Sequence, residues 1–290
     1  MYHVMCFPQG KTRAFTVSYD DGAETDFHLA ALMRTYGIRG TFNVNSQSIL
    51  KEGASSEALP LWRRRMHKDR FLEFFAEYGD LVEIASHSFT HALLTELEKG
   101  EILSETLYDR RTIEALLKRP CRGFAYPYGG VNQKVLEVIS SCGFDYARIT
   151  GQPKHPFLFP ENPLEWQCTC HHNHEDLFGI VEAFFSDSHK ARDQHRLFSV
   201  WGHSYEFEKN GNWDTVEKLF GKVGGREDVW YATNTEIFRY KKAYDALEFF
   251  ADSSHVYNPS AIPVSFILFG VDREKKCYIT VNPGETVCLK

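Results

Sequence analysis

Two histidines and two carboxylates have the spacing of a catalytic metal site. His87 and His91 stand four residues apart, so on one helical turn their imidazoles would point in the same direction. Asp20 and Asp21 are adjacent and are followed by a glycine. Two histidines and one carboxylate form a common ligand set of catalytic zinc, in which water takes the open position. Each pair alone also fits a simpler interpretation, as unrelated loop residues or as a turn and a helix cap.

Each of these pairs follows a predicted strand. Residues 13–19 and 81–86 have the apolar pattern of strands, and the two pairs come directly after them. A third predicted strand, residues 197–201, is followed closely by His203. The carboxyl ends of parallel barrel strands meet at one rim, where catalytic residues gather. We therefore expect the two pairs and His203 to meet in space.

The order of the predicted elements indicates an α/β protein. About seven strand–helix units follow one another, which predicts a parallel sheet closed into a distorted (β/α) barrel. The chain after residue 254 holds prolines and a glycine between short apolar runs without a helical period. This pattern predicts a small antiparallel β appendage packed on the barrel. The predicted domains are therefore the barrel, residues 1–254, and the appendage, residues 255–290.

Four short motifs occur in an order that a known family shares. They are residues 18–22 (SYDDG), 87–91 (HSFTH), 126–129 (YPYG) and 201–203 (WGH). These segments resemble the motifs TFDDG, H-[ST]-x-x-H, the end of RxPYG, and LxH of the polysaccharide deacetylases. That family comprises the NodB-like members of carbohydrate esterase family four. The resemblance covers most of the predicted barrel, and the ordered set is more specific than any single motif.

This resemblance implies a distorted (β/α) barrel that removes N- or O-linked acetyl groups from carbohydrates. It also implies a divalent metal, with zinc as the expected ion, bound by Asp21, His87 and His91. The general base, the general acid and the backbone N–H that stabilises the oxyanion would belong to Asp20, His203 and Tyr128, in that order. The expected substrate-binding residues are Tyr126, Pro127, His171 and His172.

The chain departs from the family pattern at two positions. Ala125 stands where the third motif has an arginine that steadies the base, and Arg122 or Arg148 could substitute for it. No segment clearly matches the fourth motif, an Asp-Trp segment that supports the acidic histidine. The nearest candidate is Glu165-Trp166.

Two other functions stay open at this stage. The alanine at the arginine position is also compatible with a carbohydrate-binding barrel that has lost turnover. A related metal-free amidohydrolase that acts on cyclic amides is a further alternative, although the intact Asp-His-His set speaks against it. Cys168, Cys170 and the histidines after them resemble a metal cluster, but a structural zinc site would normally have a second ligand pair.

The composition argues against several kinds of partner. The 290 residues carry a formal net charge of −6, which does not indicate binding to nucleic acid or to an anionic membrane. We interpret the basic run Arg63-Arg64-Arg65 as a solvated loop or helix face. No apolar run approaches the length of a membrane span, and the seven cysteines have no framework spacing. We therefore expect reduced thiols in a cytoplasmic protein. The partner that the family resemblance implies is an acetylated carbohydrate.

Overall fold

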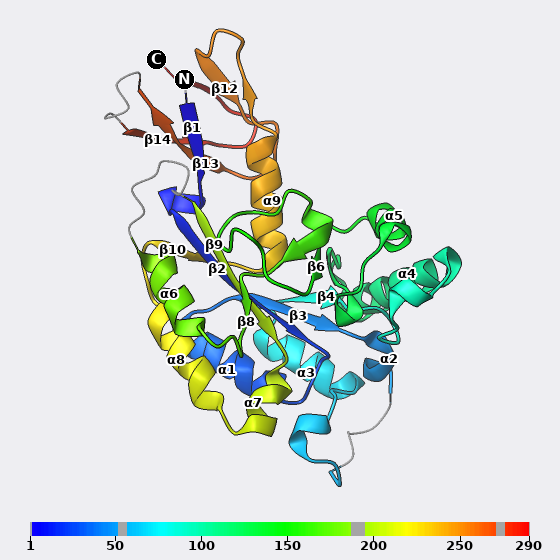
Figure 1. The fold of residues 1–290 in the computed structure, drawn as a ribbon. Helices are drawn as coiled ribbons and strands as arrows, with labels where there is room; N and C mark the ends of the chain where they lie inside the picture. The colour runs from blue at the N-terminus through cyan, green and yellow to red at the C-terminus, as the bar shows by residue number, and fades with distance from the viewer. Residues whose placement is uncertain (1, 52–56, 187–194, 271–275, 290) are drawn as a thin grey trace.

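A parallel β-sheet forms the centre of the molecule. The computed structural model describes residues 2–51, 57–186, 195–270 and 276–289 (Figure 1). Within them, nine strands form the sheet in the order β7-β6-β5-β4-β3-β2-β9-β8, and β10 pairs with β2 beside this path. Every pairing within this sheet is parallel. The strands are β2 (Arg13–Asp20), β3 (Gly40–Val44), β4 (Val82–Ser86), β5 (Gly123–Ala125), β6 (Tyr146–Ile149), β7 (Trp166–Gln167), β8 (Cys170–His171), β9 (Arg196–Gly202) and β10 (Val229–Tyr231).

Helices surround the curled sheet (Figure 1). All of β3 and all of β2 after Arg13 are buried, as is typical of central strands that are covered on both faces. The helices are α1 (Asp26–Tyr36), α2 (Ser46–Ile49), α3 (Lys68–Tyr78), α4 (Lys99–Leu117), α5 (Gln133–Ser141), α6 (Leu177–Phe185), α7 (Ser204–Asn210), α8 (Trp213–Val223) and α9 (Asn234–Asp245). The predicted α/β fold of a distorted (β/α) barrel is confirmed. The parallel sheet is curled into a half-barrel, and its end strands β7 and β8 do not pair with each other within the described residues.

Two small antiparallel sheets lie at the end of the molecule where both termini are found (Figure 1). One contains β1 (Tyr2–Cys6), β13 (Val264–Phe269) and β14 (Lys276–Val281), and the other contains β11 (Glu248–Phe249), β12 (His255–Tyr257) and β15 (Thr286–Cys288). The tail is therefore antiparallel, but the sequence did not indicate that β1 would pair with it. The division into domains 1–254 and 255–290 stays a prediction.

Several local boundaries differ from those that the sequence predicts. The pattern predicts a strand over residues 165–169, whereas only Trp166–Gln167 pairs with β6. It also predicts a helix over residues 235–250, whereas α9 begins one residue earlier and ends at Asp245. Thr233 caps α9 in a capping box, and the neighbouring asparagine is its first helical residue. Among the described residues, no helix is long and apolar enough to cross a membrane.

Candidate active site

The polar residues that follow the central strands lie at the carboxyl end of the sheet. Asp20 is the last residue of β2, and Asp21 follows it with a left-handed φ of 81°. His87 directly follows β4, and His203 directly follows β9. β2 is bonded to β9, and only β3 separates it from β4, so the ends of these strands share one rim. A left-handed aspartate is uncommon, and such backbone conformations cluster at functional sites.

Asp21, His87 and His91 form a compact set of potential ligand atoms. The Oδ1 atom of Asp21 lies 3.8 Å from Nε2 of His87 and 3.6 Å from Nε2 of His91. Zinc binds such ligands at about 2.0–2.2 Å, so ligand atoms around one tetrahedral ion lie roughly 3–4 Å apart. The Nδ1 atom of His87 donates to the carbonyl of Ala125 at 2.8 Å, which leaves Nε2 for a metal. The three side chains therefore fit a divalent ion.

The segment from His87 to His91 is a loop and not the helical turn that its spacing suggests. Ser88 and His91 have left-handed φ values of 61° and 63°. Asn45 donates to the carbonyls of His87 and Ser88, and Glu105 on α4 accepts two hydrogen bonds of 2.9 Å from the residue before His91. The two imidazoles still converge, with ring centroids 4.8 Å apart, because these side chains fix the loop.

Asp20 is a buried carboxylate that is held in its ionised form. Its Oδ1 atom accepts a hydrogen bond from Asn43 at 2.8 Å, and its Oδ2 atom accepts one from Arg148. Burial would raise the pKa of Asp20. The charges of Arg148, His87 and His203 outweigh burial and lower the pKa to about 2. The carboxylate can therefore accept a proton at neutral pH.

Arg148 supplies the guanidinium that the third motif lacks. It lies on β6 at the position paired with Ala125 on β5, so the neighbouring strand provides the arginine. Arg148 is 1% exposed, and its guanidinium carbon lies 4.8 Å from the centre of the Trp201 ring. Arg122, the other candidate in the sequence, pairs instead with Asp145 at 2.9 Å. Of the two arginines, Arg148 is thus the one that contacts the carboxylate at the end of β2.

Glu206 on α7 contacts three histidines at the rim. Its Oε2 atom lies 2.9 Å from Nε2 of His172 and 3.3 Å from Nε2 of His171, and its Oε1 atom lies 3.3 Å from Nδ1 of His203. Burial would raise the pKa of Glu206, but the three imidazoles hold it well below its usual range. Burial would lower the pKa of His203, but Glu206 and the carboxylates at the end of β2 raise it above its ordinary value. The imidazolium form of His203 is therefore favoured.

The sequence candidate for the fourth motif does not contact His203. Glu165 is exposed and accepts a hydrogen bond from Asn162 at 2.7 Å, while Trp166 packs inside a hydrophobic cluster. Glu206 provides the carboxylate instead, three residues after His203 and one helical turn away. That spacing was visible in the sequence, but it does not distinguish a functional carboxylate from a surface one.

Of the two histidines expected to bind substrate, only one reaches the surface. His172 is buried, and its ring centroid lies 5.6 Å from that of Tyr19 and 4.1 Å from that of Phe207. Burial lowers the pKa of His172 to about 4, against the opposing effect of Glu206. The side chain of His171 is 25% exposed. His172 is therefore placed to hold Glu206, whereas His171 can contact a ligand.

The YPYG segment places one tyrosine at the surface and one in the core. Tyr128 is 68% exposed, has a left-handed φ of 58°, and lies edge-on to the ring of His91 at 4.6 Å. Tyr126 and Pro127 are buried, and the hydroxyl of Tyr126 donates to the carbonyl of Leu164 at 3.0 Å. Tyr128 thus borders the potential metal ligands, while the side chain of Tyr126 fixes the loop by packing.

The predicted cysteine–histidine cluster has a different composition in the structure. Within the described ranges, a second group of potential ligand atoms contains His171, His203 and Glu206, without Cys168 or Cys170. Burial raises the pKa of each of these two thiols to about 12. A metal binds the thiolate and not the thiol, so these cysteines are poor ligands at neutral pH.

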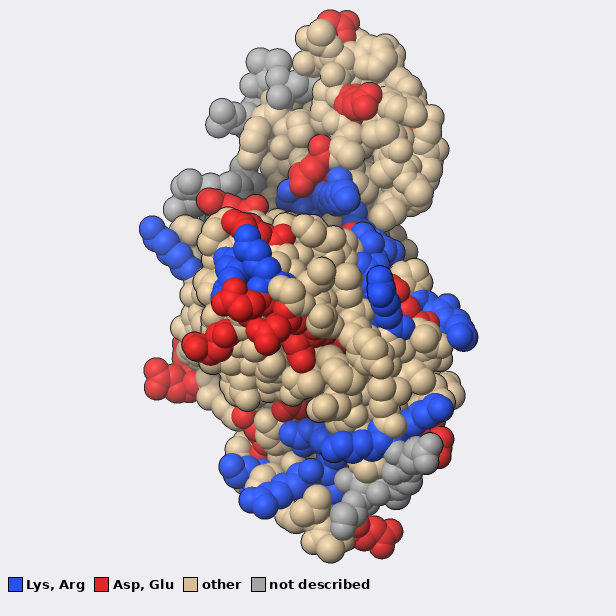
Figure 2. Space-filling view, turned by 90° about the vertical axis from the view of Figure 1, so that its right-hand side faces the viewer, with Lys and Arg blue, Asp and Glu red and all other residues tan. Residues whose placement is uncertain are grey.

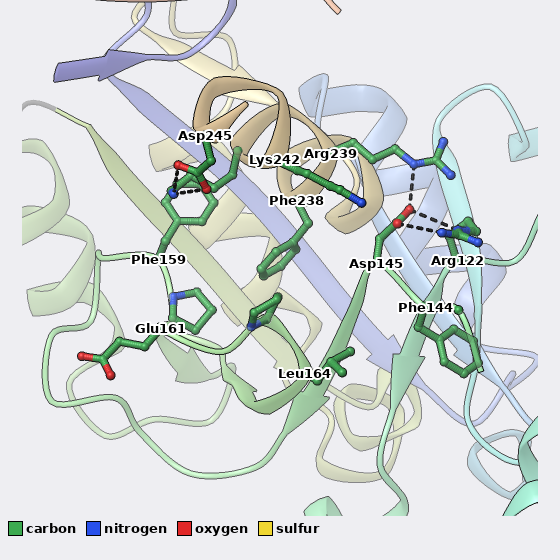
Figure 3. A pocket seen from close by; sticks show the side chains of 14 residues that line it. Arg122, Phe144, Asp145, Phe159, Glu161, Leu164, Phe238, Arg239, Lys242 and Asp245 are labelled. Atoms are coloured by element: carbon green, nitrogen blue, oxygen red, sulfur yellow. Dashed lines mark hydrogen bonds and ion pairs between the residues drawn. The ribbon is translucent and has the colours of Figure 1, made fainter. Parts of the chain in front are cut away.

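A cavity of about 520 Å³ lies at the opposite end of the strands (Figure 3). Arg122 and Asp145, which line it, directly precede β5 and β6, so the cavity is at the amino end of these strands. Asp145 pairs with Arg122 at 2.9 Å and with Arg239 of α9 at 2.8 Å, as Figure 3 shows. These pairs connect α9 to the sheet, and none of the predicted site residues lines the cavity.

Comparisons with known proteins identify the family. Residues 8–147 match the family model of the polysaccharide deacetylases. A candidate polysaccharide deacetylase from Mycobacterium smegmatis has a similar fold, with a TM-score of 0.61 and 16% identity over 82% of this chain and 93% of that chain. A family 4 carbohydrate esterase from Streptomyces lividans, solved in complex with acetate, gives a TM-score of 0.48 and 14% identity over 77% of this chain and 93% of that chain. No curated protein sequence matches. By this match, residues 8–147 of the chain belong to the polysaccharide deacetylase family.

Proposed function

We propose that the chain is a zinc-dependent hydrolase that removes N- or O-linked acetyl groups from a carbohydrate. Family membership supports carbohydrate deacetylation in general. The observation that carries the finer proposal is the triad of Asp21, His87 and His91, whose ligand atoms lie within 4.8 Å of one another. These residues would hold the ion, since two histidines and one carboxylate leave a position open for water. When bound, zinc polarises the acetyl carbonyl and acidifies water.

Asp20 is proposed as the general base. It accepts the proton of the attacking water, and its low pKa keeps it ionised for that purpose. The hydrogen bonds from Asn43 and Arg148 orient the carboxylate. The backbone N–H of Tyr128 is proposed to donate to the oxyanion that forms on the acetyl group. The proximity of Tyr128 to His91 supports this role.

His203 is proposed as the general acid. A sugar amine or alkoxide leaves poorly as an anion, so a proton must reach it as the bond breaks. The raised pKa of His203 favours the imidazolium, which can donate that proton. Glu206 contacts Nδ1, which leaves Nε2 as the donor. In this arrangement Glu206 is a positioning residue that takes the part of the carboxylate missing from the fourth motif.

Release of acetate from acetylated mono- and oligosaccharides by the zinc-loaded protein tests the proposal. Asp20→Asn should keep its metal and lose turnover by on the order of 10²-fold or more, because a base is removed while the ligands stay. His87→Ala with His91→Ala should lose the metal as well, which elemental analysis measures. Full metal occupancy in that double variant would refute the ligand assignment.

The same assay separates the alternatives. A carbohydrate-binding barrel without turnover would bind the acetylated sugar and release no acetate. A metal-free amidohydrolase would hydrolyse a cyclic amide after treatment with a chelator. The contact between Arg148 and Asp20 weakens the argument for a barrel without turnover. Although Ala125 replaces the family arginine, Asp20 still has an arginine beside it.

A cytoplasmic location is also proposed. None of the seven cysteines forms a disulfide, which supports a reducing compartment. Measurement of free thiols in protein isolated from its native host, without added reductant, tests this. Seven reactive thiols after denaturation would agree with the proposal.

A further inference from the structure

The basic run Arg63-Arg64-Arg65 is attached to the loop that carries Asp21. The N–H of Met66 donates to the carbonyl of Gly22 at 2.9 Å, and the N–H of Glu24 donates to the carbonyl of Arg64 at 3.1 Å. Between these two bonds, Arg65 forms an antiparallel bridge with the same loop. The run is therefore a solvated loop whose backbone is fixed to the rim.

Arg65 and Tyr205 form a wall beside the metal ligands. The guanidinium of Arg65 lies 3.3 Å from Oδ2 of Asp21, and its carbon lies 4.8 Å from the centre of the Tyr205 ring. The Tyr205 ring centroid is 5.0 Å from that of His203. The side chain of Arg65 is 31% exposed, so its guanidinium is accessible from the rim. A cation thus stands within contact distance of a potential ligand carboxylate.

The wall continues outward through Trp62. Two cations lie over its ring, with the Arg63 guanidinium carbon 4.6 Å and the Lys209 ammonium 5.4 Å from its centre. Both cations are exposed. No described carboxylate lies within ion-pair distance of Arg63 or Lys209. Glu208, on the helix of Lys209, instead accepts a hydrogen bond from the indole N–H of Trp213. Their positive charge is therefore available to a ligand.

Figure 2 views the side of the molecule toward which the strands run, and Lys and Arg side chains gather at its lower end. Since the chain as a whole carries a net charge of −6, this is a local reversal of sign. Flat aromatic faces suit the apolar faces of sugar rings. Guanidinium groups bind carboxylates and phosphates in planar, bidentate geometry. The surface thus combines the two chemistries that an acidic sugar chain requires.

We propose that the rim binds an anionic glycan, whose carboxylate or phosphate groups lie against the wall of Trp62, Arg63, Arg65, Tyr205 and Lys209. This inference rests on the proposed function and adds the class of its substrate: an acetylated carbohydrate with acidic groups on units next to the acetylated one. The fixed cations attract the chain and set its direction across the metal ligands. Stacking on Trp62 keeps Arg63 and Lys209 in place, so little side-chain freedom is lost on binding.

Three acetylated oligosaccharides of equal length test the proposal. They are a neutral N-acetylglucosamine tetramer, a tetramer that alternates N-acetylglucosamine with glucuronate, and an N-acetylglucosamine oligomer joined by phosphodiesters. We expect kcat/KM to be about tenfold or more higher for an acidic chain than for the neutral one, and this preference to fall as ionic strength rises. The preferred acidic chain identifies carboxylate or phosphate as the natural group. Equal kcat/KM for all three chains would overturn the proposal.

The double variant Arg63→Gln, Lys209→Gln provides the residue-level test. It should lower the acidic-to-neutral ratio of kcat/KM by roughly tenfold, as expected when electrostatic attraction is lost. Lys222→Gln is the matched control, because this exposed lysine lies at the carboxyl end of α8, shortly before the amino end of β10 and away from the rim. It should leave the ratio unchanged. An unchanged ratio in the double variant would contradict the assignment of the wall.

Calorimetry separates failure of this inference from failure of the proposed function. The neutral and the glucuronate-containing tetramers are titrated into the wild-type protein and into the double variant. Tighter binding of the acidic tetramer, weakened in the double variant, supports the inference even if no acetate is released from any substrate. Equal affinity for the two tetramers contradicts it, whatever the activity.

Discussion

Arg148 provides a guanidinium next to Asp20 from a different strand than the family motif does. The family motif places an arginine on the strand that here carries Ala125. In this chain the guanidinium comes from Arg148, at the paired position on β6. Both side chains of the ion pair between Arg148 and Asp20 are buried. Two charges taken out of water depend on each other, so loss of one leaves the other uncompensated. The arginine is therefore expected to matter for stability as well as for catalysis.

Replacement of Arg148 by methionine should lower the free energy of unfolding by about 3–5 kcal/mol, because Asp20 would remain as a buried, unpaired carboxylate. Urea denaturation measures this difference. The double variant Asp20→Asn, Arg148→Met is the control, since it removes both charges and should recover most of the lost stability. If the single Arg148→Met variant were as stable as wild type, the buried pair would not be an energetic unit.

Glu206→Gln should move the alkaline limb of the pH–rate profile to lower pH. The proposed acid, His203, must be protonated, so the rate falls as pH rises through its pKa. Glu206 helps to raise that pKa against the effect of burial, and a neutral glutamine would not. The pH dependence of kcat on an acetylated oligosaccharide measures the shift. Glu208→Gln, on the same helix, is the matched control, because Glu208 accepts instead from the indole of Trp213. An unmoved alkaline limb in Glu206→Gln would remove Glu206 from this role.

At the residue scale, the sequence predicted that residues following different strands would lie close together. The pair His87 and His91 and the adjacent aspartates could be recognised because they follow strands whose ends must share a rim. Arg148 could be named only as one of two candidates, because the register between β5 and β6 cannot be predicted from the sequence of either strand. Glu206 was not predicted as a partner of His203, since a carboxylate one turn into a helix is common at any surface.

At the scale of elements, a buried contact joins the helices that follow two rim-forming strands. Asp26, the first residue of α1, accepts a hydrogen bond of 2.5 Å from Ser204, the first residue of α7. Burial raises the pKa of Asp26 to about 8, although the bond from Ser204 opposes it. The folded protein therefore holds a proton that the unfolded chain releases above about pH 4.

The sign of this linkage gives a prediction for Asp26→Asn. The contribution of Asp26 is complete below about pH 4 and is lost as pH rises toward about 8, because the unfolded state binds fewer protons over that window. Asparagine stays neutral and can still accept from Ser204, so the variant should gain stability relative to wild type by on the order of a few kcal/mol at pH 8.5 and by much less at pH 5. Urea midpoints at the two pH values measure this, with the exposed Asp69→Asn as control. A difference that does not grow with pH would mean that Asp26 is ionised in the folded protein.

The elements themselves were predictable to different degrees. The central strands β2 and β4 were found close to their observed limits, since they are mostly apolar and largely buried. The pattern placed β7 inside a longer predicted strand and did not indicate β8, because two residues carry no period. The loop from His87 to His91 has helical spacing without a helix, and hydrogen bonds from Asn45 and Glu105 replace the helical ones.

At the scale of the whole molecule, the two ends of the chain are packed together. β1 pairs along its full length with β13, whose six residues are all buried. Tyr240 of α9 connects this sheet to the barrel, because its hydroxyl donates to the carbonyl of Cys6 at 2.7 Å and accepts from the N–H of Ser265 at 2.9 Å. A long-range pairing of this kind follows from tertiary packing, so the tail pattern alone could not reveal its partner.

Removal of residues 255–290 should destabilise the protein without removing the metal site. The deletion would leave β1 as an unpaired strand and expose the face of α9 and β11 that the tail covers, so we expect aggregation or a lower melting temperature. Phe266→Ala is the milder variant: this buried side chain belongs to the tail's own hydrophobic cluster, and its truncation should cost about 3–5 kcal/mol. Metal content and kcat of Phe266→Ala at a temperature where it is folded should match wild type, because β13 pairs with β1 and β14 and not with the strands of the rim. A soluble, folded deletion variant that keeps its metal but releases no acetate would instead make the tail part of the active site.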